Sequence, residues 1–344
     1  MKKVGFQMLL AFLMVVILPG FMLRFVEKKV ISGETQLDVA TTEETFLTEN
    51  KETEENTQTE QTMEPEQLKT ETIVLESNGV VSQIDEDSYI VGVILAEMPV
   101  SFHDEALKAQ AVVARTYARK TIATGSKHEY GGICADSGCC QAYCRPEDFI
   151  DRGGNAEDVE RVQRLVIQTR AEVLLYEGEL IEATYFSCSG GRTEDAVAVW
   201  GTMIPYLQAT DSPGEENAEH FTDTVRFQAE EFARLLQIST SLLPGSWFGA
   251  VTYTTGGGVD TIEICGQAFT GKDLRRILGL RSTAFQISAI GQTIIITTKG
   301  FGHRVGMSQY GADAMAVRGN SYIEILQHYY PGTELKTVEM IDKG

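Results

Sequence analysis

Basic residues are scarce in this chain. Its 344 residues contain 29 lysines and arginines against 49 aspartates and glutamates, which gives a formal net charge of −20. Nucleic-acid binding requires a basic surface, so this shortage argues against a nucleic-acid partner. The serines lack a G-x-S-x-G motif, which argues against a serine hydrolase with a nucleophile elbow. No internal repeat is evident, and the length suits one large domain, or two smaller ones, with tails.

One long hydrophobic run is present, at the N-terminus. Residues 4–23 are uncharged, follow Lys2 and Lys3, and are numerous enough to span a bilayer. The run lacks the small-residue A-x-A pattern of a cleavage site, so we expect an uncleaved anchor. The preceding lysines favour a cytoplasmic N-terminus, although Arg24 and the other basic residues beyond the run weaken this orientation. We predict a single-pass cell-membrane protein with residues 1–32 as cytoplasmic stub and transmembrane anchor.

Residues 33–72 have almost no aromatic side chains. They are rich in glutamate, threonine and glutamine, and Lys51 and Lys69 are their only basic residues. Such a segment cannot bury enough apolar surface to offset the entropy lost on ordering, so we predict an extended acidic, disordered linker. The remaining residues, 73–344, would form an extracytoplasmic domain. That domain is less acidic than the whole chain, because much of the excess negative charge lies in the linker.

Two consecutive helices are predicted around Pro99. Residues 85–97 begin with acidic side chains, which suit the positive end of a helix dipole, and continue with apolar residues on most faces, which indicates burial. In the second helix Ser101 and Asp104 resemble a capping box, and Gly125 can end the helix.

Glu97 stands out because it lies in the last turn of the first helix, since Pro99 biases Met98 away from helical backbone angles. A carboxylate there meets the negative end of the helix dipole in an apolar setting. Both conditions raise a carboxyl pKa, so Glu97 is a candidate for proton transfer near neutral pH. Arg115, in the second helix, lies among small and apolar residues, where a guanidinium usually needs a partner. The alternatives are a solvated helix-end acid and a snorkelling arginine.

Two further stretches combine glycines with polar and aromatic side chains. Residues 185–194 run from a strand into a Gly-Gly turn, and residues 300–312 contain four glycines. Glycine lets the backbone approach a ligand closely, and side-chain hydroxyls can bond its oxygens. The candidate ligand contacts are Ser187, Ser189, Thr193, His303, Ser308, Gln309 and Tyr310. By contrast, His103 at a helix start and His328 in an apolar helical run are expected to be structural.

Residues 97–99 (EMP), 105–111 (EALKAQA) and 114–118 (ARTYA) together resemble the signature of the stage II sporulation protein D family. The resemblance implies a peptidoglycan lytic transglycosylase that acts when an endospore is engulfed. It places the catalytic glutamate of the family at Glu97 and an arginine tied to activity at Arg115. The implied substrate is glycan strands already stripped of stem peptides. The implied partners are the sporulation amidase, stage II sporulation protein P, and a membrane scaffold, stage II sporulation protein M.

The resemblance covers roughly residues 80–337 and includes both Gly-rich stretches, each of which departs from the family pattern at one position. Cys188 stands where threonine or asparagine is usual. Arg304 stands where glycine is expected, which puts the backbone angles of that loop in doubt.

A lytic transglycosylase can act with one carboxyl group, whereas glycoside hydrolases normally need two. The C6 hydroxyl of muramic acid serves as nucleophile, and the product is a 1,6-anhydro sugar. Glu97 would donate a proton to the glycosidic oxygen and then accept one from that hydroxyl, while Arg115 would orient Glu97 or contact substrate. Two other classes remain open: a zinc-dependent peptidoglycan hydrolase in which water attacks, and a non-catalytic wall-binding module that recruits partners.

Four of the six cysteines fall within residues 128–144. Disulfides are the usual expectation outside the cytoplasm, but the neighbours Cys139 and Cys140 can scarcely bond to each other. Clustered thiolates and imidazoles suit tetrahedral zinc. The resemblance implies a structural Zn²⁺, because some family members bind zinc in this insertion. Its implied ligands are His128, Cys134, Cys139 and Cys140, where Cys139 stands in place of the second histidine of those members. Cys144 is left over, as an alternative ligand or a free thiol. Isolated Cys188 and Cys265 are expected to be buried.

The periodicity of the remaining residues predicts an α+β fold, with a helical core and antiparallel β-hairpins. We expect helices at 156–169, 228–237, 272–278, 305–317 and 322–330, and hairpins at 173–186 and 284–298. Strands joined by hairpins, with few alternating crossovers, argue against a doubly wound sheet.

Overall fold

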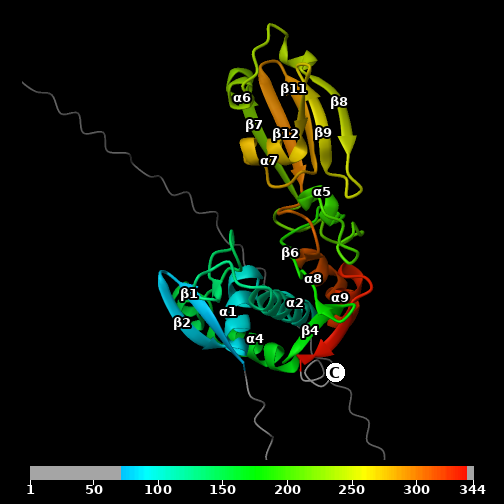
Figure 1. Ribbon diagram of the computed structural model, residues 1–344. Helices are drawn as coiled ribbons and strands as arrows, with labels where there is room; N and C mark the ends of the chain where they lie inside the picture. Colours follow the sequence, from blue (N-terminus) through cyan, green and yellow to red (C-terminus); the bar gives the residue numbers. More distant parts are fainter. Residues whose placement is uncertain (1–70, 339–344) are drawn as a thin grey trace, which may run out of the picture. The chain divides into compact units, whose positions relative to one another are not determined.

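The computed structural model describes residues 71–338 of the chain (Figure 1). The predicted anchor, residues 1–32, and all but the end of the predicted linker, residues 33–72, lie outside the described residues. Within 71–338, no helix combines the length and the apolar character needed to cross a membrane. This part of the chain has the predicted α+β fold, with helices beside antiparallel sheets.

The described residues begin with a hairpin that the sequence analysis did not predict. Strands β1 (Thr72–Ser77) and β2 (Val80–Asp85) pair antiparallel through Asn78 and Gly79, which both have positive φ. Asn-Gly is the commonest pair for this tight turn. The short strand β3 (Ile133–Cys134) pairs parallel with β1 and thereby fixes the start of the cysteine-rich insertion.

The predicted helix pair is present as α1 (Glu86–Glu97) and α2 (Asp104–Ala123). Met98 has extended backbone angles, as expected before proline. The predicted cap of α2 was wrong: His103 precedes the helix, and its ring accepts the backbone N–H of Glu105 at 3.2 Å. Ser101 cannot serve, because it lies in a turn closed by the Phe102 N–H and the Pro99 carbonyl.

Helix α2 occupies the centre of the first hydrophobic core. It packs against α1, α4 (Ala156–Gln168), α8 (Gln309–Val317), α9 (Tyr322–Tyr329) and strand β4 (Glu172–Tyr176). Its buried face is built largely from alanine and valine, and these small side chains allow close approach on several sides. Strand β4 is the middle strand of a sheet with β5 (Glu179–Leu180) and β14 (Glu334–Thr337).

The predicted strand at the end of the 173–186 hairpin is divided in two. Only β5 pairs with β4; β6 (Tyr185–Phe186) pairs parallel with β13 (Met307–Ser308). Strand β13 also shortens the predicted 305–317 helix, because Ser308 caps α8 by accepting the Gly311 N–H. The β6–β13 pairing therefore brings the two Gly-rich stretches side by side.

A second hydrophobic core lies between those two stretches in sequence, in residues 222–299. Its sheets have the orders β11-β12-β7 and β10-β9-β8. The helices and the β11–β12 hairpin match the prediction, whereas β8, β9 and β10 were not predicted. The elements are β7 (Thr222–Gln228), α6 (Ala229–Leu236), β8 (Phe248–Tyr253), β9 (Val259–Ile264), β10 (Gln267–Thr270), α7 (Gly271–Leu278), β11 (Phe285–Ile290) and β12 (Thr293–Lys299). A 3₁₀ turn, Pro244–Ser246, precedes β8, and two short helices, α3 (Pro146–Asp151) and α5 (Ala196–Trp200), lie outside this segment.

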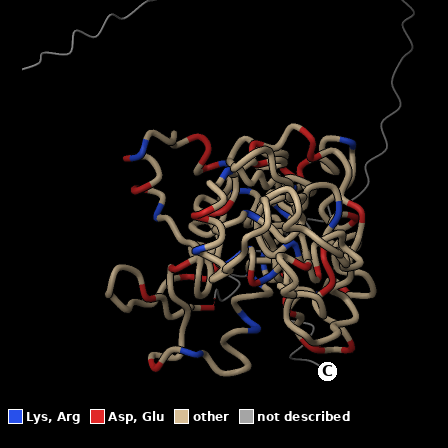
Figure 2. Tube along the Cα trace, turned by 90° about the horizontal axis from the view of Figure 1, so that it is seen from above, with Lys and Arg blue, Asp and Glu red and all other residues tan. Residues whose placement is uncertain are grey.

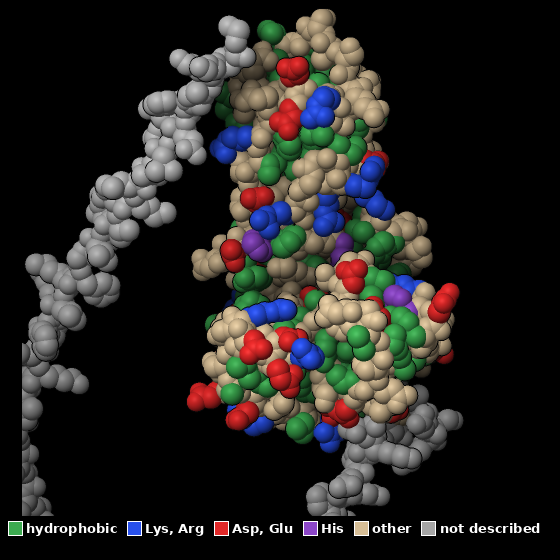
Figure 3. Space-filling model, turned by 90° about the vertical axis from the view of Figure 1, so that its left-hand side faces the viewer, with side chains coloured by type: hydrophobic (Ala, Val, Ile, Leu, Met, Phe, Trp, Pro, Cys, Tyr) green, Lys and Arg blue, Asp and Glu red, His purple; other side chains and the backbone are tan. Residues whose placement is uncertain are grey.

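Acidic and basic residues are interspersed along the described chain (Figure 2). The face drawn in Figure 3 carries side chains of both charges rather than one continuous acidic field. Such a surface does not by itself repel an anionic polymer, because local cations lie between the acids.

Candidate functional site

A cleft of about 910 Å³ contains Glu97 together with both Gly-rich stretches. This volume lies in the range of small-ligand pockets, which is roughly 300–1,000 Å³. The lining combines the end of α1, Tyr117 of α2, residues 137–141 of the cysteine-rich insertion, strand β6, the loop 301–303 and the start of α8 with Trp200, Glu219 and His220. The residues that surround Glu97 thus come from parts of the chain that lie far apart in the sequence.

Glu97 is half-buried and lines this cleft, and opposing effects act on its pKa. Burial raises the pKa, because a carboxylate loses hydration there. The backbone N–H of Ala142 donates to Oε1 at 2.8 Å, and the hydroxyl of Tyr185 also bonds the carboxyl group; both lower the pKa. Burial prevails, so the pKa of Glu97 lies above its ordinary value.

Gln141 fixes the hydroxyl group of Tyr185. The Tyr89 hydroxyl donates to Oε1 of Gln141 at 2.9 Å, and Nε2 of Gln141 donates to the Tyr185 hydroxyl oxygen at 3.1 Å. The Tyr185 oxygen is thus an acceptor toward Gln141, which leaves its own proton to be donated to Glu97. Gln141 and Ala142 directly follow Cys140, so the insertion positions both donors to Glu97.

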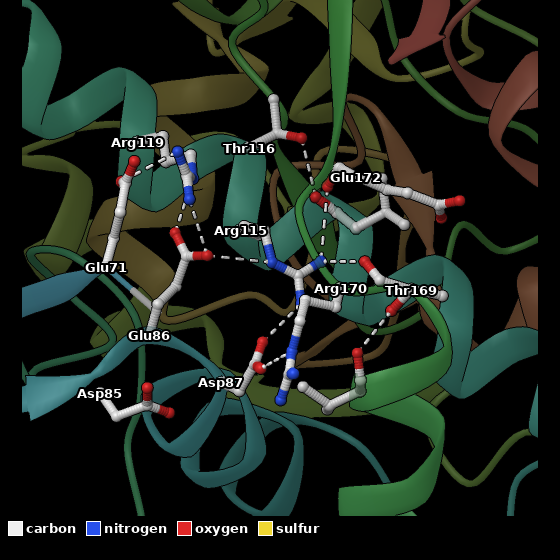
Figure 4. A network of polar contacts seen from close by, with 12 residues as sticks. Glu71, Asp85, Glu86, Asp87, Arg115, Thr116, Arg119, Thr169, Arg170 and Glu172 are labelled. Carbon is white, nitrogen blue, oxygen red and sulfur yellow. Dashed lines mark hydrogen bonds and ion pairs between the residues drawn. The ribbon is translucent and has the colours of Figure 1, made fainter. Parts of the chain in front are cut away.

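Arg115 does not line the cleft, and its polar contacts are with residues other than Glu97. Figure 4 shows these contacts at the start of α1. Its guanidinium is fully buried, 3.3 Å from a carboxylate oxygen of Asp87 and 3.4 Å from one of Glu86, and it donates to the Thr169 carbonyl at 2.7 Å. These acids begin α1, whereas Glu97 ends it, about 16 Å away for a helix of this length. The partner expected for Arg115 is present, but the geometry gives it no direct part in orienting Glu97 or in touching substrate.

The predicted ligand contacts divide into two groups. Ser187, His303, Gln309 and Tyr310 line the cleft. Nε2 of Gln309 is buried and has no hydrogen-bond partner among the described residues, so this amide can donate to a ligand.

Ser189, Thr193 and Ser308 are fully buried instead and do not line the cleft. Their hydroxyl groups are used internally: Ser189 donates to Glu215 at 2.9 Å and Thr193 accepts the Thr210 N–H at 2.7 Å. Ser308 caps α8. Each of these hydroxyls holds the loop that carries the cleft residues, so the three act on the shape of the site.

Glu215 organises the Gly-Gly turn, a role that no pattern in the sequence indicates. Its carboxylate is 1 % exposed and accepts the backbone N–H groups of Ser189 at 2.7 Å and Gly190 at 3.2 Å. The Cys188 thiol donates to the same carboxylate at 3.1 Å, and burial raises the pKa of that thiol. Cys188 is buried as expected. Cys265 is only partly buried, and it occupies a turn position with positive φ.

Arg304 adopts the backbone conformation that the expected glycine would favour. Its φ is +67°, in the left-handed region. The strain is offset by its side chain, which is 2 % exposed and donates to the carbonyls of Ser189 at 2.9 Å, Arg192 at 2.8 Å and Gly256 at 2.6 Å. The arginine thus ties the two Gly-rich stretches to the segment that holds the second core.

The four predicted metal ligands lie together. The ligand atoms of His128, Cys134, Cys139 and Cys140 are all within 4.8 Å of one another. Nε2 of His128 is 3.3 Å from Sγ of Cys140 and 3.7 Å from Sγ of Cys139. Ligand bonds of about 2.0–2.3 Å to tetrahedral zinc place neighbouring ligand atoms about 3.5–3.8 Å apart, so this set fits zinc. The cysteines of the described residues form no disulfide, and Cys144 stands outside the cluster.

Several cleft residues were missed by the sequence analysis. Trp200, Glu219 and His220 line the cleft from loops and a short helix that carry no distinctive pattern. Gln141 and Tyr185 adjoin motifs that were recognised, but their hydrogen bonds join residues 44 and 52 positions apart.

These features define an α+β protein whose cleft holds one half-buried carboxyl group between two glycine-rich turns. Residues 74–176 match the family described as stage II sporulation protein, SpoIID. The chain is 39% identical over 268 residues to stage II sporulation protein D of Bacillus amyloliquefaciens, covering 76% of this chain and 77% of that protein. It is 37% identical to stage II sporulation protein D of Bacillus subtilis (strain 168), over 76% and 78% of the two chains. The chain belongs to the stage II sporulation protein D family.

A more distant relative is the amidase enhancer of Bacillus subtilis (strain 168), which is 30% identical over 306 residues. That match covers 71% of this chain and 40% of the amidase enhancer.

Proposed function

We propose that this chain is a lytic transglycosylase that cleaves the MurNAc-β-1,4-GlcNAc bonds of peptide-stripped peptidoglycan during engulfment in sporulation, leaving 1,6-anhydro-MurNAc ends. The observation that supports this most directly is Glu97, a half-buried acid with a raised pKa in a cleft bounded by both Gly-rich stretches. Membership of a sporulation family, and a relative named as an amidase enhancer, favour a role at the cell wall.

Glu97 would act twice in this reaction. Its raised pKa keeps a larger fraction protonated near neutral pH, and that proton is donated to the glycosidic oxygen as the bond breaks. The carboxylate left behind is stabilised by the Ala142 N–H and the Tyr185 hydroxyl. It then removes the proton from the C6 hydroxyl, whose oxygen closes on C1. Acid–base catalysis of this kind contributes about 10²–10⁴-fold, and binding and orientation by the cleft supply the rest.

One observation favours a second candidate, a hydrolase that uses water. Glu219 also lines the cleft, is exposed, and could activate a water molecule opposite Glu97. Two other buried carboxylates near the Gly-rich stretches, Glu194 and Glu215, are saturated by hydrogen bonds from loop N–H and hydroxyl groups, which leaves them no role in proton transfer.

The products decide between these activities. Sacculi treated with an amidase are incubated with the full chain or with its Glu97→Gln and Glu219→Gln variants, and the fragments are weighed by mass spectrometry. We expect wild type and Glu219→Gln to release anhydro ends, which are lighter by one water than reducing ends, and Glu97→Gln to release none. If wild type instead releases reducing ends and Glu219→Gln releases none, the protein is a hydrolase. Binding without any product, in wild type and variants alike, would establish a non-catalytic wall-binding module.

The remaining assignments are part of the same proposal. His128, Cys134, Cys139 and Cys140 would hold a Zn²⁺ whose role is to fix the insertion, since four protein ligands leave no open position for substrate. Residues 1–32 would anchor the protein in the membrane, with the catalytic domain outside the cytoplasm. The partners would be the amidase and the membrane scaffold, stage II sporulation proteins P and M.

A further inference from the structure

The cleft has an aromatic wall that the proposed acid–base chemistry leaves unused. Trp200 lines the cleft and is 43% exposed, although indole is among the largest apolar side chains. It ends the short helix α5, and Gly201 follows with a φ of +76°, which closes the helix. The carbonyl of Val199 accepts a hydrogen bond from Nζ of Lys272 at 3.1 Å. The backbone that carries Trp200 is therefore held on both sides, while its side chain is partly exposed.

The neutral, fixed ring of His303 packs beside the indole of Trp200. The His303 ring centroid lies 5.6 Å from that of Trp200 and 5.7 Å from that of Phe186. Its Nδ1 accepts the Val305 N–H at 3.1 Å, and the ring also hydrogen-bonds the backbone of Tyr185. Burial lowers the pKa of His303 to about 4, so the ring is uncharged at neutral pH. A histidine held in this way is a packing partner for Trp200 and not a proton carrier.

We propose that the indole of Trp200 is a stacking subsite for one β-1,4-linked N-acetylhexosamine ring of a glycan strand. The axial C–H bonds of such a pyranose make an apolar face that matches the flat face of an aromatic ring, while its hydroxyl and amide groups project from the edge. The same cleft holds the unpartnered Nε2 of Gln309, which can donate to such an edge group. This subsite rests on the proposed function for its ligand, but it requires binding only and no cleavage.

Tryptophan fluorescence tests the subsite directly, because the chain has two tryptophans. The other, Trp247, is 5% exposed in the second core, and its Nε1 donates to the Leu242 carbonyl at 3.0 Å. The full chain carrying Glu97→Gln is titrated with a β-1,4-linked tetramer of N-acetylglucosamine. We expect the indole emission to change on binding in this parent and after Trp247→Phe, and to stay constant after Trp200→Phe.

Calorimetric titration of the same proteins measures the affinity. Trp200→Ala should weaken binding about ten-fold, which corresponds to about 1.4 kcal/mol, whereas Trp200→Phe should retain most of the affinity because it keeps a flat ring. Met203→Ala is the matched control: this neighbouring apolar side chain is 79% exposed but does not line the cleft, so the affinity should not change. Circular dichroism and thermal melting verify that each variant is folded.

Binding that leaves the emission of Trp200 unchanged, or equal affinities for Trp200→Ala and its parent, would overturn the subsite while leaving the transglycosylase proposal intact. Absence of binding by every variant would overturn it as well. In that case the products that wild type releases from sacculi decide separately whether the proposed function stands.

Discussion

At the residue scale, the ionisation of Glu97 depends on contacts that can be removed one at a time. Tyr185→Phe deletes a donor that lowers the pKa of Glu97, so this pKa should rise further. The proposed acid must start protonated, and activity therefore falls as pH rises through its pKa. We expect the descending limb of the pH–rate profile to move to higher pH in Tyr185→Phe. The maximal rate should fall about ten-fold, since one hydrogen bond to the developing carboxylate is lost.

Tyr206→Phe is the control for this experiment. Tyr206 is half-buried like Tyr185, and its hydroxyl accepts the Glu182 N–H at 3.0 Å outside the cleft. Its pH–rate profile should match that of wild type. An unmoved profile in Tyr185→Phe would mean that the tyrosine hydroxyl does not govern the ionisation of Glu97.

A second residue-scale prediction separates stability from catalysis at Arg115. Arg115→Met leaves Glu86 and Asp87 buried beside an apolar side chain, although Arg119 and Arg170 still pair with them at 2.6 Å each. We expect a loss of about 3 kcal/mol in the free energy of unfolding, measured in urea, because breaking a buried ion pair is costly. Arg276→Met removes an exposed helical pair and should cost less than about 0.5 kcal/mol.

Activity per folded molecule then tests how Arg115 is connected to Glu97. Arg115 contacts the start of α1, whereas Glu97 lies at the end of that helix. The Arg115→Met molecules that stay folded should therefore cleave glycan at close to the wild-type rate. A folded Arg115→Met protein that is nearly inactive would show that the start of α1 controls the geometry of its end.

Residue-level reasoning could predict the position of Glu97 but not its environment. Pro99 and the helix pattern are local signals, and they put this carboxyl group in the last turn of α1. Its two hydrogen-bond donors come from residues 45 and 88 positions further along, where nothing in the sequence marks them as neighbours. Arg115 was correctly expected to need a partner, but its acids lie a full helix length from the site with which it was associated.

At the element scale, the cysteine-rich insertion connects the proposed metal to catalysis. The proposed ligand Cys140 precedes Gln141 and Ala142, whose side chain and backbone N–H hold Tyr185 and Glu97. Removing Zn²⁺ with a chelator should therefore lower the melting temperature and abolish cleavage, and added Zn²⁺ should restore both. Metal content is measured by plasma mass spectrometry beside activity and thermal melting.

Cys144→Ser serves as the control for metal binding, because Cys144 lies outside the ligand cluster. This variant should bind as much zinc as wild type, whereas Cys140→Ser should bind less. A Cys134–Cys140 disulfide in the purified protein, without bound metal, would contradict the zinc assignment.

Helices and strands were predictable where a capping or turn residue in the local sequence marks their ends. Thr270 before α7 and the Gly291-Gln292 turn between β11 and β12 are of this kind. Asn78-Gly79 is an equally strong hairpin signal that was overlooked beside the acidic linker. The β6–β13 pair could not be predicted, because two residues on each strand carry no period and the pairing joins positions 122 apart.

At the scale of the whole molecule, residues 222–299 have the organisation of an inserted unit. The first residue of β7, Thr222, pairs with the last residue of β12, Lys299, so the chain enters and leaves this segment at adjacent positions. Cleft residues stand directly outside both ends, with His220 before the segment and Phe301 after it. The sequence concealed this arrangement, since β8 to β10 were not predicted and the two Gly-rich stretches appeared unrelated.

If the second core is self-sufficient, the segment 222–299 expressed alone should unfold cooperatively in urea, as followed by circular dichroism. A unit this small is marginally stable. Phe232 is fully buried, and Phe232→Ala should lower the free energy of unfolding by about 3–5 kcal/mol. This loss should abolish the cooperative transition. Tyr253→Ala changes an exposed side chain and should preserve it. The isolated segment would lose its contacts with the rest of the chain, among them the Thr254 hydroxyl to Glu194, Lys272 to the Val199 carbonyl, and Arg304 to the Gly256 carbonyl. Absence of cooperative unfolding in the unmutated segment would mean that the second core depends on these contacts, and that the whole described chain folds as one unit.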